Sequence, residues 1–179
     1  PRDMDRDVRL AKEVGVDVAF SPSATDMYPE GYQTHIEVTE VTRPLCGKSR
    51  PGHFQGVTTV VGKLFHIVKP HTAIFGEKDF QQLRIIQALV AMENLSVEVV
   101  PCPTVREADG LAMSSRNTYL SPAERAAAPV LHRVLKQAEE TIGRGERDAR
   151  RLAEALLATI SAEGMAQLDY LAISDPETL

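Results

Sequence analysis

An alternation of helical and extended patterns between residues 57 and 100 constrains the fold more than any other feature of the sequence. Apolar residues at 57, 60, 61, 64, 65 and 68 have the spacing of a helix with one core-facing side, and Pro70 ends it. TAIF (72–75) and SVEVV (96–100) predict strands, with a second helix between them at 80–93 whose inward positions are Leu83, Ile86, Leu89 and Val90. This alternation implies crossover connections and a parallel sheet.

The segment before this region predicts one further helix-to-strand step. Residues 4–14 have a helical pattern that Gly15 stops, and VDVAF (16–20) predicts a short apolar strand. The following stretch, 21–56, is rich in Pro, Gly and Thr, with a possible strand at THIEVTEV (34–41). Because it is too long for a simple connection, we expect it to line a site.

After Pro103 the pattern changes. The polar loop TVREADGLAMSSRNTYLSP (104–122) precedes two predicted helices, at about 122–142 and 147–163, and a last strand, QLDYLAI (167–173). Pro129 is expected to kink the first of these helices or to start its second half. We therefore expect an α/β domain at 1–103 and a small α+β domain at 104–179.

Composition narrows the classes of protein to consider. The 179 residues are 43% hydrophobic and 25% charged, as in a globular chain with a core, and the net charge of −5 offers no general attraction to nucleic acid or anionic membranes. Cys46 and Cys102 form no C-x-x-C pair, which argues against a disulfide framework and favours a cytoplasmic location. No apolar run approaches the ~18 residues of a membrane span.

The stretch FGEKDFQQLRIIQ (75–87) is the first candidate site. Lys78 falls at the predicted start of a helix, where a cation typically costs ~0.3–1 kcal/mol. Asp79 and Gln82 have the spacing of a capping box, which explains those two residues structurally. Gly76 follows a strand at the place where ligands gather in parallel sheets, and a phosphate there would pair with Lys78 and the helix amides. The alternative is a solvated surface lysine.

SRPGHFQG (49–56), just before the helix at 57–68, is the second candidate. Arg50 offers a planar fork suited to a carboxylate or phosphate, and His53 offers a neutral or charged donor. The alternative is a plain turn with Pro51 and Gly52 at its corner and His53 as a cap.

MSSRN (113–117) is the third candidate. Two hydroxyls and a guanidinium on a polar loop can surround a polyphosphate, although serine-rich loops are also common linkers. The chain has no G-x-x-x-x-G-K-[ST] and no G-x-G-x-x-G, which argues against a P-loop enzyme or a dinucleotide fold. The other histidines show no metal-ligand spacing, so no metal ligands are assigned; they are His35, His66, His71 and His132.

Taken together and in order, four motifs resemble the pantothenate synthetase family over nearly the whole chain: MYPEG, SRPGHFQGVTTVV, FGEKDFQQL and VREADGLAMSSRNTYLS. The resemblance implies a Rossmann-like nucleotidyltransferase sheet and a small C-terminal domain with a mobile MSSRN loop. It also implies a homodimeric, AMP-forming ligase that joins pantoate to β-alanine through a pantoyl adenylate, using ATP and Mg²⁺.

The resemblance also implies roles for individual residues. Lys78, Ser114, Ser115 and Arg116 would be catalytic, and Gln82, Arg50 and His53 would lie at the substrates, with pantoate on Gln82. The implied ATP contacts are Gly76, Glu77, Lys78, Asp79, Val105, Met113, Ser114, Ser115 and Arg116. No protein nucleophile is required, and the partner of Lys78 would be the α-phosphate of the nucleotide or adenylate.

Parts of the family pattern fall outside the sequence. The loop with two histidines that hold the ATP phosphates, and a pantoate-binding motif, would precede Pro1, and the last strands would follow Leu179. We therefore expect a partial sequence with an incomplete sheet, and no pantothenate formation by residues 1–179 alone. Two alternatives remain: a related adenylyltransferase for another small acid, and a non-catalytic binding or dimerisation module.

Overall fold

The computed structural model describes residues 3–179 and divides the chain into a short unit that ends at Thr34 and a larger unit from His35 to Leu179. The short unit holds α1 (Met4–Glu13) and α2 (Ala24–Met27). The larger unit holds α3 (Cys46–Ser49), α4 (His53–Val68), β1 (Thr72–Gly76), the 3₁₀ turn η1 (Glu77–Asp79), α5 (Phe80–Met92), β2 (Glu98–Cys102), the 3₁₀ turn η2 (Ser115–Tyr119), α6 (Pro122–Ala127), α7 (Val130–Gly143) and α8 (Ala149–Ser161).

The short unit confirms the predicted helix but not the predicted strand. The Asp3 side chain accepts a hydrogen bond from the Arg6 amide and caps α1, which ends just before Gly15 at a φ of +86°. Residues 16–20 have no regular structure, and Val18 is 81% exposed. The strand prediction was wrong because an extended segment becomes a strand only when a neighbour takes up its backbone hydrogen bonds, and none of the described residues pairs with it.

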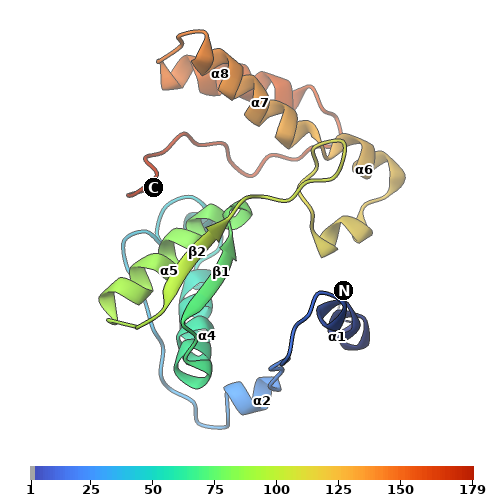
Figure 1. The fold of residues 1–179 in the computed structure, drawn as a ribbon. Coiled ribbons are helices and arrows are strands. Elements are labelled where there is room, and N and C mark those ends of the chain that lie inside the picture. Colours follow the sequence, from blue (N-terminus) through green and yellow to red (C-terminus); the bar gives the residue numbers. More distant parts are fainter. Residues whose placement is uncertain (1–2) are drawn as a thin grey trace. The chain divides into compact units, whose positions relative to one another are not determined.

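β1, α5 and β2 form a strand–helix–strand unit in the larger unit (Figure 1). β1 and β2 pair in parallel, from Thr72 opposite Glu98 to Gly76 opposite Cys102, and α5 makes the crossover between them. The predicted parallel α/β arrangement is confirmed, with β2 two residues later than its apolar pattern indicated.

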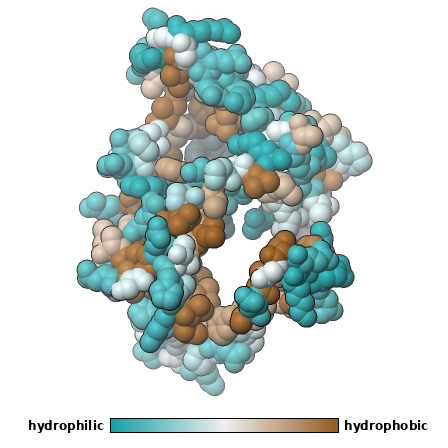
Figure 2. Space-filling view, viewed as in Figure 1, coloured by the Kyte–Doolittle hydropathy of each residue, from teal (hydrophilic) through white to brown (hydrophobic). Residues whose placement is uncertain are grey.

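The core of this unit lies where α4 and α5 cover one face of the strand pair. Ile85 and Ile86 of α5 are fully buried, and Phe54 and Phe65 of α4 pack in the same cluster. The other face is open, since Ile74 of β1 is 69% exposed. On the side of the molecule that Figure 2 draws, hydrophobic residues form brown patches between hydrophilic ones.

Residues 34–41 do not form the possible strand suggested by their sequence. The Ile36 amide donates to Thr59 Oγ1 at 3.0 Å, and Thr58 Oγ1 donates to the Ile36 carbonyl at 2.5 Å. Threonine side chains of α4 therefore satisfy the backbone that a neighbouring strand would otherwise bind.

The C-terminal part contains a second and separate core. α7 and α8 pack through Val130, Val134, Leu152, Leu156 and Ile160. Pro129 is the N-cap of α7, so the predicted helix at 122–142 is two helices, and Pro129 starts the second one as one of the two predicted outcomes. Residues 167–173 form no strand, because no described segment pairs with them, and this prediction was wrong. No helix in the described part of the chain is long and apolar enough to cross a membrane.

Candidate functional site

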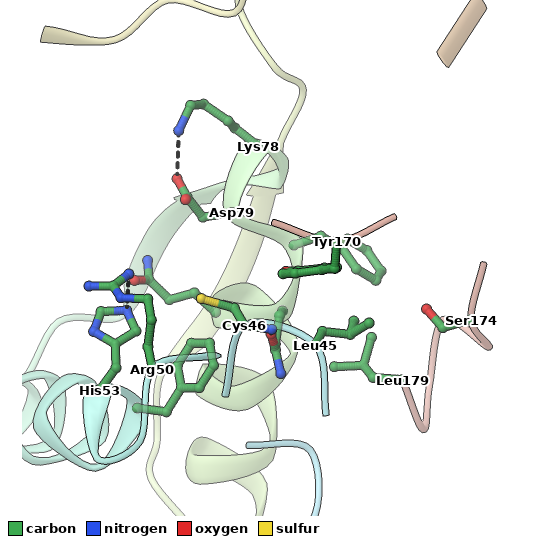
Figure 3. A pocket seen from close by; sticks show the side chains of 13 residues that line it. Leu45, Cys46, Arg50, His53, Lys78, Asp79, Tyr170, Ser174 and Leu179 are labelled. Atoms are coloured by element: carbon green, nitrogen blue, oxygen red, sulfur yellow. Dashed lines mark hydrogen bonds and ion pairs between the residues drawn. The ribbon is translucent and has the colours of Figure 1, made fainter. Parts of the chain in front are cut away.

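The carboxyl end of β1 leads directly into the first candidate stretch. Gly76 ends the strand, Glu77–Asp79 form the turn η1, and α5 begins at Phe80. Lys78 therefore lies in a tight turn before the helix rather than inside its first turn. Its ammonium pairs with Asp79, with 3.3 Å between Nζ and Oδ2 (Figure 3).

Asp79 occupies the N-cap position of α5 but does not cap it. It makes no side-chain hydrogen bond to the helix amides, so the predicted capping box with Gln82 is absent and that prediction was wrong. The carboxylate is directed at Lys78 instead, and the ion pair replaces the cap. The first amides of α5 consequently have no side-chain acceptor from Asp79, which leaves hydrogen-bonding capacity at this end of the helix.

A cavity of about 340 Å³ opens beside this turn. Its walls come from the 45–54 segment, from residues 78–82, and from the C-terminal segment through Tyr170, Ser174 and Leu179 (Figure 3). Five residues singled out in the sequence line it together: Arg50, His53, Lys78, Asp79 and Gln82. Asp79 is the only acidic side chain among the lining residues, so the cationic groups face a space suited to an anion.

Arg50 and His53 are brought together by the turn that starts α4. Gly52 is the N-cap at a φ of +77°, which confirms the turn, whereas His53 is the first helical residue and caps nothing. The Arg50 guanidinium contacts His53, with 3.2 Å between Nη1 and Nε2 (Figure 3). Burial lowers the pKa of His53, and the charge of Arg50 lowers it further, with Asp79 opposing. A neutral His53 can accept this bond at Nε2.

The adjacent glutamines of α5 have different environments. Gln81 is 8% exposed, and its Oε1 accepts from the Cys46 amide at 3.1 Å. Its Nε2 donates to the carbonyls of Val41 and Pro44, at 2.9 Å each, and so fixes the 41–46 loop that forms one cavity wall. The half-buried Gln82 makes no side-chain hydrogen bond within the described residues, and it lines the cavity.

Sequence reasoning missed Gln81 although a signal for it exists. The spacing of 81, 85 and 89 places Gln81 in one row with the buried Ile85 and Leu89. Tyr170 was also missed, because its segment was assigned to a strand. Burial raises the pKa of Tyr170, and the charges of Cys46 and Asp169 act in the same direction.

The third candidate stretch forms a separate group. The Met113 amide donates to the Val105 carbonyl at 2.9 Å, so these two exposed residues are neighbours. Ser114 caps η2 by accepting from the Arg116 amide at 3.2 Å. Met113–Arg116 do not line the 340 Å³ cavity, and the Arg116 guanidinium makes no ion pair with any residue in 3–179.

Lys78 stands between the two groups. With Glu77 it also lines a second cavity, of about 530 Å³, whose lining includes Arg106, Ala112 and His132 from the C-terminal part. The structure therefore gathers the residues of the first two motifs at one cavity and connects them, through Lys78, to the segment that precedes Met113–Arg116.

Comparison with known proteins gives a consistent family assignment. Residues 1–179 match the family described as Pantoate-beta-alanine ligase. A pantothenate synthetase of Heliobacterium modesticaldum is 59% identical over 175 residues, which cover 98% of this chain and 62% of the relative. One from Acetivibrio thermocellus is 52% identical over 179 residues, which cover 100% of this chain and 64% of the relative.

Solved structures agree with the sequence relatives. Pantothenate synthetase from Thermus thermophilus has a TM-score of 0.96 at 49% identity, covering 100% of this chain and 65% of that one. Pantoate-beta-alanine ligase from Francisella tularensis, complexed with beta-gamma ATP and beta-alanine, has a TM-score of 0.74 at 34% identity, covering 89% and 59%. The chain thus spans slightly less than two thirds of the length of these relatives, and it belongs to the pantoate–β-alanine ligase family.

Proposed function

We propose that this protein joins pantoate to β-alanine in an ATP-dependent reaction that yields pantothenate, AMP and pyrophosphate. Membership of the ligase family supports the class of reaction. The observation that carries the proposal is the cavity at the end of β1, where Arg50, His53, Lys78 and Gln82 converge from two separate motifs. These groups suit two anionic substrates held side by side.

The proposed chemistry has two displacements. The pantoate carboxylate attacks the α-phosphate of ATP, forming the acyl–phosphate bond as the bond to the leaving pyrophosphate breaks. The amine of β-alanine, after losing a proton, then attacks the acyl carbon and displaces AMP. No protein nucleophile takes part, so the protein contributes by aligning the reactants and stabilising charge on the transferred phosphate.

Lys78 is the residue we propose for stabilising that charge. Its present partner, Asp79, is 3.3 Å away, and the lysine side chain is 38% exposed, so the pair is weak and open to exchange. A phosphate that also accepts from the first amides of α5 would be a stronger partner than one exposed carboxylate.

The remaining assignments follow the two groups of residues. We propose that Gln82 binds pantoate through its unpaired amide, with Arg50 and His53 beside the substrates. Arg50 keeps a fixed charge, and the lowered pKa of His53 favours the neutral form of this histidine. The proposed ATP contacts are Gly76, Glu77, Lys78, Asp79, Val105, Met113, Ser114, Ser115 and Arg116, with Ser114, Ser115 and Arg116 assisting catalysis.

Mg²⁺ is proposed as the counter-ion that accompanies ATP. Among residues 3–179 no group of three or more His, Cys, Asp or Glu side chains is arranged to hold a metal ion. Mg²⁺ commonly binds through substrate phosphates with only one or two carboxylates, so the phosphates would carry it here.

Three broader features are proposed with the reaction. The separate cores around Ile85 and around Val134 support a domain boundary near 103–104. The two free cysteines fit a cytoplasmic location. A homodimer, which the family resemblance suggests, is tested by light scattering of the purified protein.

The test of the proposed function is exchange of labelled pyrophosphate into ATP by the protein as its gene encodes it. Exchange should require pantoate, because labelled pyrophosphate enters ATP only by attacking the pantoyl adenylate, and this adenylate forms only from pantoate. Pantothenate and AMP should then appear in equal amounts when β-alanine is added. Exchange supported by another small acid but not by pantoate would favour a related adenylyltransferase, and ATP binding without any exchange would favour a binding module.

A further inference from the structure

The Met113–Arg116 segment follows a small hairpin formed by residues 105–113. Its two arms are joined by the Met113 amide, which donates to Val105 O at 2.9 Å, and by the Glu107 amide, which donates to Leu111 O at 2.8 Å. The turn closes with a bond from the Gly110 amide to Glu107 O at 2.9 Å. The hairpin therefore delivers Met113 at a defined place, directly before Ser114.

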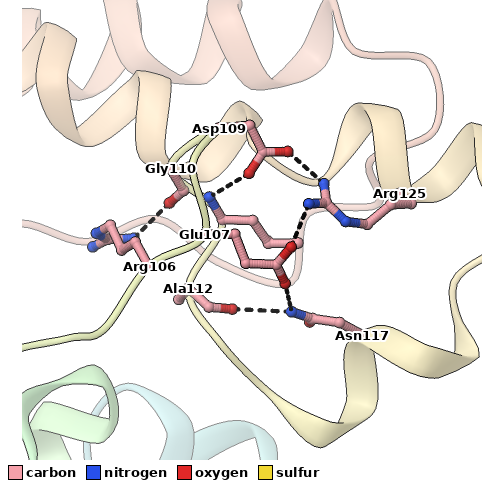
Figure 4. Close-up of polar contacts among 8 residues, drawn as sticks. Arg106, Glu107, Asp109, Gly110, Ala112, Asn117 and Arg125 are labelled. Carbon is pink, nitrogen blue, oxygen red and sulfur yellow. Dashed lines mark hydrogen bonds and ion pairs between the residues drawn. The ribbon is translucent and has the colours of Figure 1, made fainter.

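Arg125 of α6 holds this hairpin through two carboxylates (Figure 4). Its Nη2 lies 2.7 Å from Glu107 Oε2, and its Nη1 lies 2.6 Å from Asp109 Oδ2. Bonds between a guanidinium and carboxylates are directional as well as strong, so two of them fix orientation. α7 supports the turn from another side, because a Cβ at Gly110 would clash with the His132 ring.

Glu107 also links the hairpin to η2. Its Oε1 accepts from Asn117 Nδ2 at 3.2 Å, and the same nitrogen donates to Ala112 O at 3.1 Å (Figure 4). Asn117 and Ala112 are thus tied together, and only Met113–Arg116 lie between them. These bonds restrict the loop that the family resemblance implied to be mobile, and a segment so short with both ends fixed has few conformations to lose when it binds a ligand.

Ordinary stabilisation does not explain this arrangement well. The side chains of Arg125, Glu107 and Asp109 are 32%, 37% and 43% exposed, and ion pairs at such sites contribute little to folding. The single guanidinium of Arg125 also pairs with two carboxylates, so these ion pairs do not neutralise the charge of the cluster. What all of these bonds do is restrain the segment that carries Ser114, Ser115 and Arg116.

We propose that Arg125, acting through Glu107 and Asn117, is a positioning residue that holds Met113–Arg116 in place for the phosphates of ATP. The inference rests on the proposed function, in which this segment contacts ATP. Arg125 itself touches no substrate. Its loss leaves the cavity that contains Gln82 and His53 intact, so ATP and pantoate should be affected differently.

The experiment compares Arg125→Ala with Arg133→Ala in the protein as its gene encodes it. Arg133 is a matched control, because it forms an exposed ion pair with Glu163 at 3.3 Å and lies outside the hairpin. Arg125→Ala should raise KM for ATP by roughly tenfold and leave KM for pantoate within about twofold, since only the ATP segment loses its anchor. Arg125→Lys keeps the positive charge but lacks the planar guanidinium. Its KM for ATP should therefore lie between those of Arg133→Ala and Arg125→Ala.

Two results would overturn the proposal. If Arg125→Ala lowers kcat with both KM values unchanged, Arg125 affects only the fraction of the protein that is folded and active. If Arg125→Ala and Arg133→Ala have equal effects, the network has no special relation to ATP.

Amide hydrogen exchange separates this inference from the proposed function. Arg125→Ala should speed exchange in residues 113–117 at least severalfold without affecting α5, and Arg133→Ala should not. This readout needs no turnover. Loss of protection in a protein that fails the pantoate-dependent exchange assay would therefore contradict the proposed function and not the anchoring, whereas unchanged protection would contradict the anchoring itself.

Discussion

The turn after β1 and the hairpin at 105–113 present their polar groups by opposite means. The first is built on α5, whose Ile85 and Ile86 are fully buried. The side-chain amide of Gln81 in this helix forms hydrogen bonds through both its oxygen and its nitrogen. The hairpin has no such core and is held by Arg125 through half-exposed carboxylates. The strength of buried apolar contacts depends little on salt and pH, whereas salt screens exposed ion pairs and pH changes their charges. The two halves of the proposed site should therefore respond differently to mutation and to solution conditions.

The largest effect should come from the core beneath the turn. Ile86→Ala should lower the free energy of unfolding by about 2–5 kcal/mol, because it leaves a cavity in a fully buried position. Urea unfolding measures the change. Met92→Ala on the same helix, where the side chain is 69% exposed, should cost less than about 1 kcal/mol and serves as the control. Equal losses for the two variants would contradict the assigned core.

The neighbouring glutamines give the next largest effect and control each other. Gln81→Leu should destabilise the protein by about 1–3 kcal/mol, because it leaves the Cys46 amide and two carbonyls without their partner. Gln82→Leu should leave the unfolding transition unchanged, since the Gln82 side chain makes no hydrogen bond in the described structure, and should raise KM for pantoate roughly tenfold. Destabilisation by Gln82→Leu with normal kinetics would instead favour a purely structural role for Gln82.

The smallest effect is the pH dependence of the hairpin. The bond from Arg125 lowers the pKa of Asp109, and the Leu111 amide adds to this. Since the folded pKa is depressed, the stabilisation is present above the unfolded value of about 3.9 and is lost as pH falls through the lower folded pKa. The difference in unfolding free energy between wild type and Asp109→Asn should therefore shrink below about pH 4. A difference that grows in acid would contradict this assignment.

Local periodicity was sufficient to predict the strand–helix–strand unit. The apolar spacing of residues 57–68 and 80–93 predicted α4 and α5, although α4 begins four residues earlier, at His53. The strand between these helices and the strand after α5 were also predicted. The strands predicted at 16–20 and 167–173, and the possible strand at 34–41, were wrong for one physical reason. A strand depends on a neighbour, and local sequence does not show whether a neighbour exists, as when Ile36 bonds to threonines of α4 instead.

The candidate site was predictable only in part. The order of motifs predicted that Arg50, His53, Lys78 and Gln82 belong together, and the structure places them at one cavity. Pairs between distant residues left no such signal. Arg125 and Glu107 are 18 residues apart, and nothing in either local pattern indicates the contact.

The most direct test of the proposed mechanism is pantoate-dependent exchange of pyrophosphate into ATP by Lys78→Ala, measured beside Lys136→Ala. Lys136 is a matched control, since it is an exposed lysine paired with a carboxylate, Glu139, on its own helix and outside both cavities. We predict that Lys78→Ala lowers exchange roughly 100-fold, about 3 kcal/mol, with the unfolding transition unchanged, and that Lys136→Ala has no effect. Exchange near the wild-type rate in Lys78→Ala would contradict the claim that this lysine stabilises the phosphate during transfer.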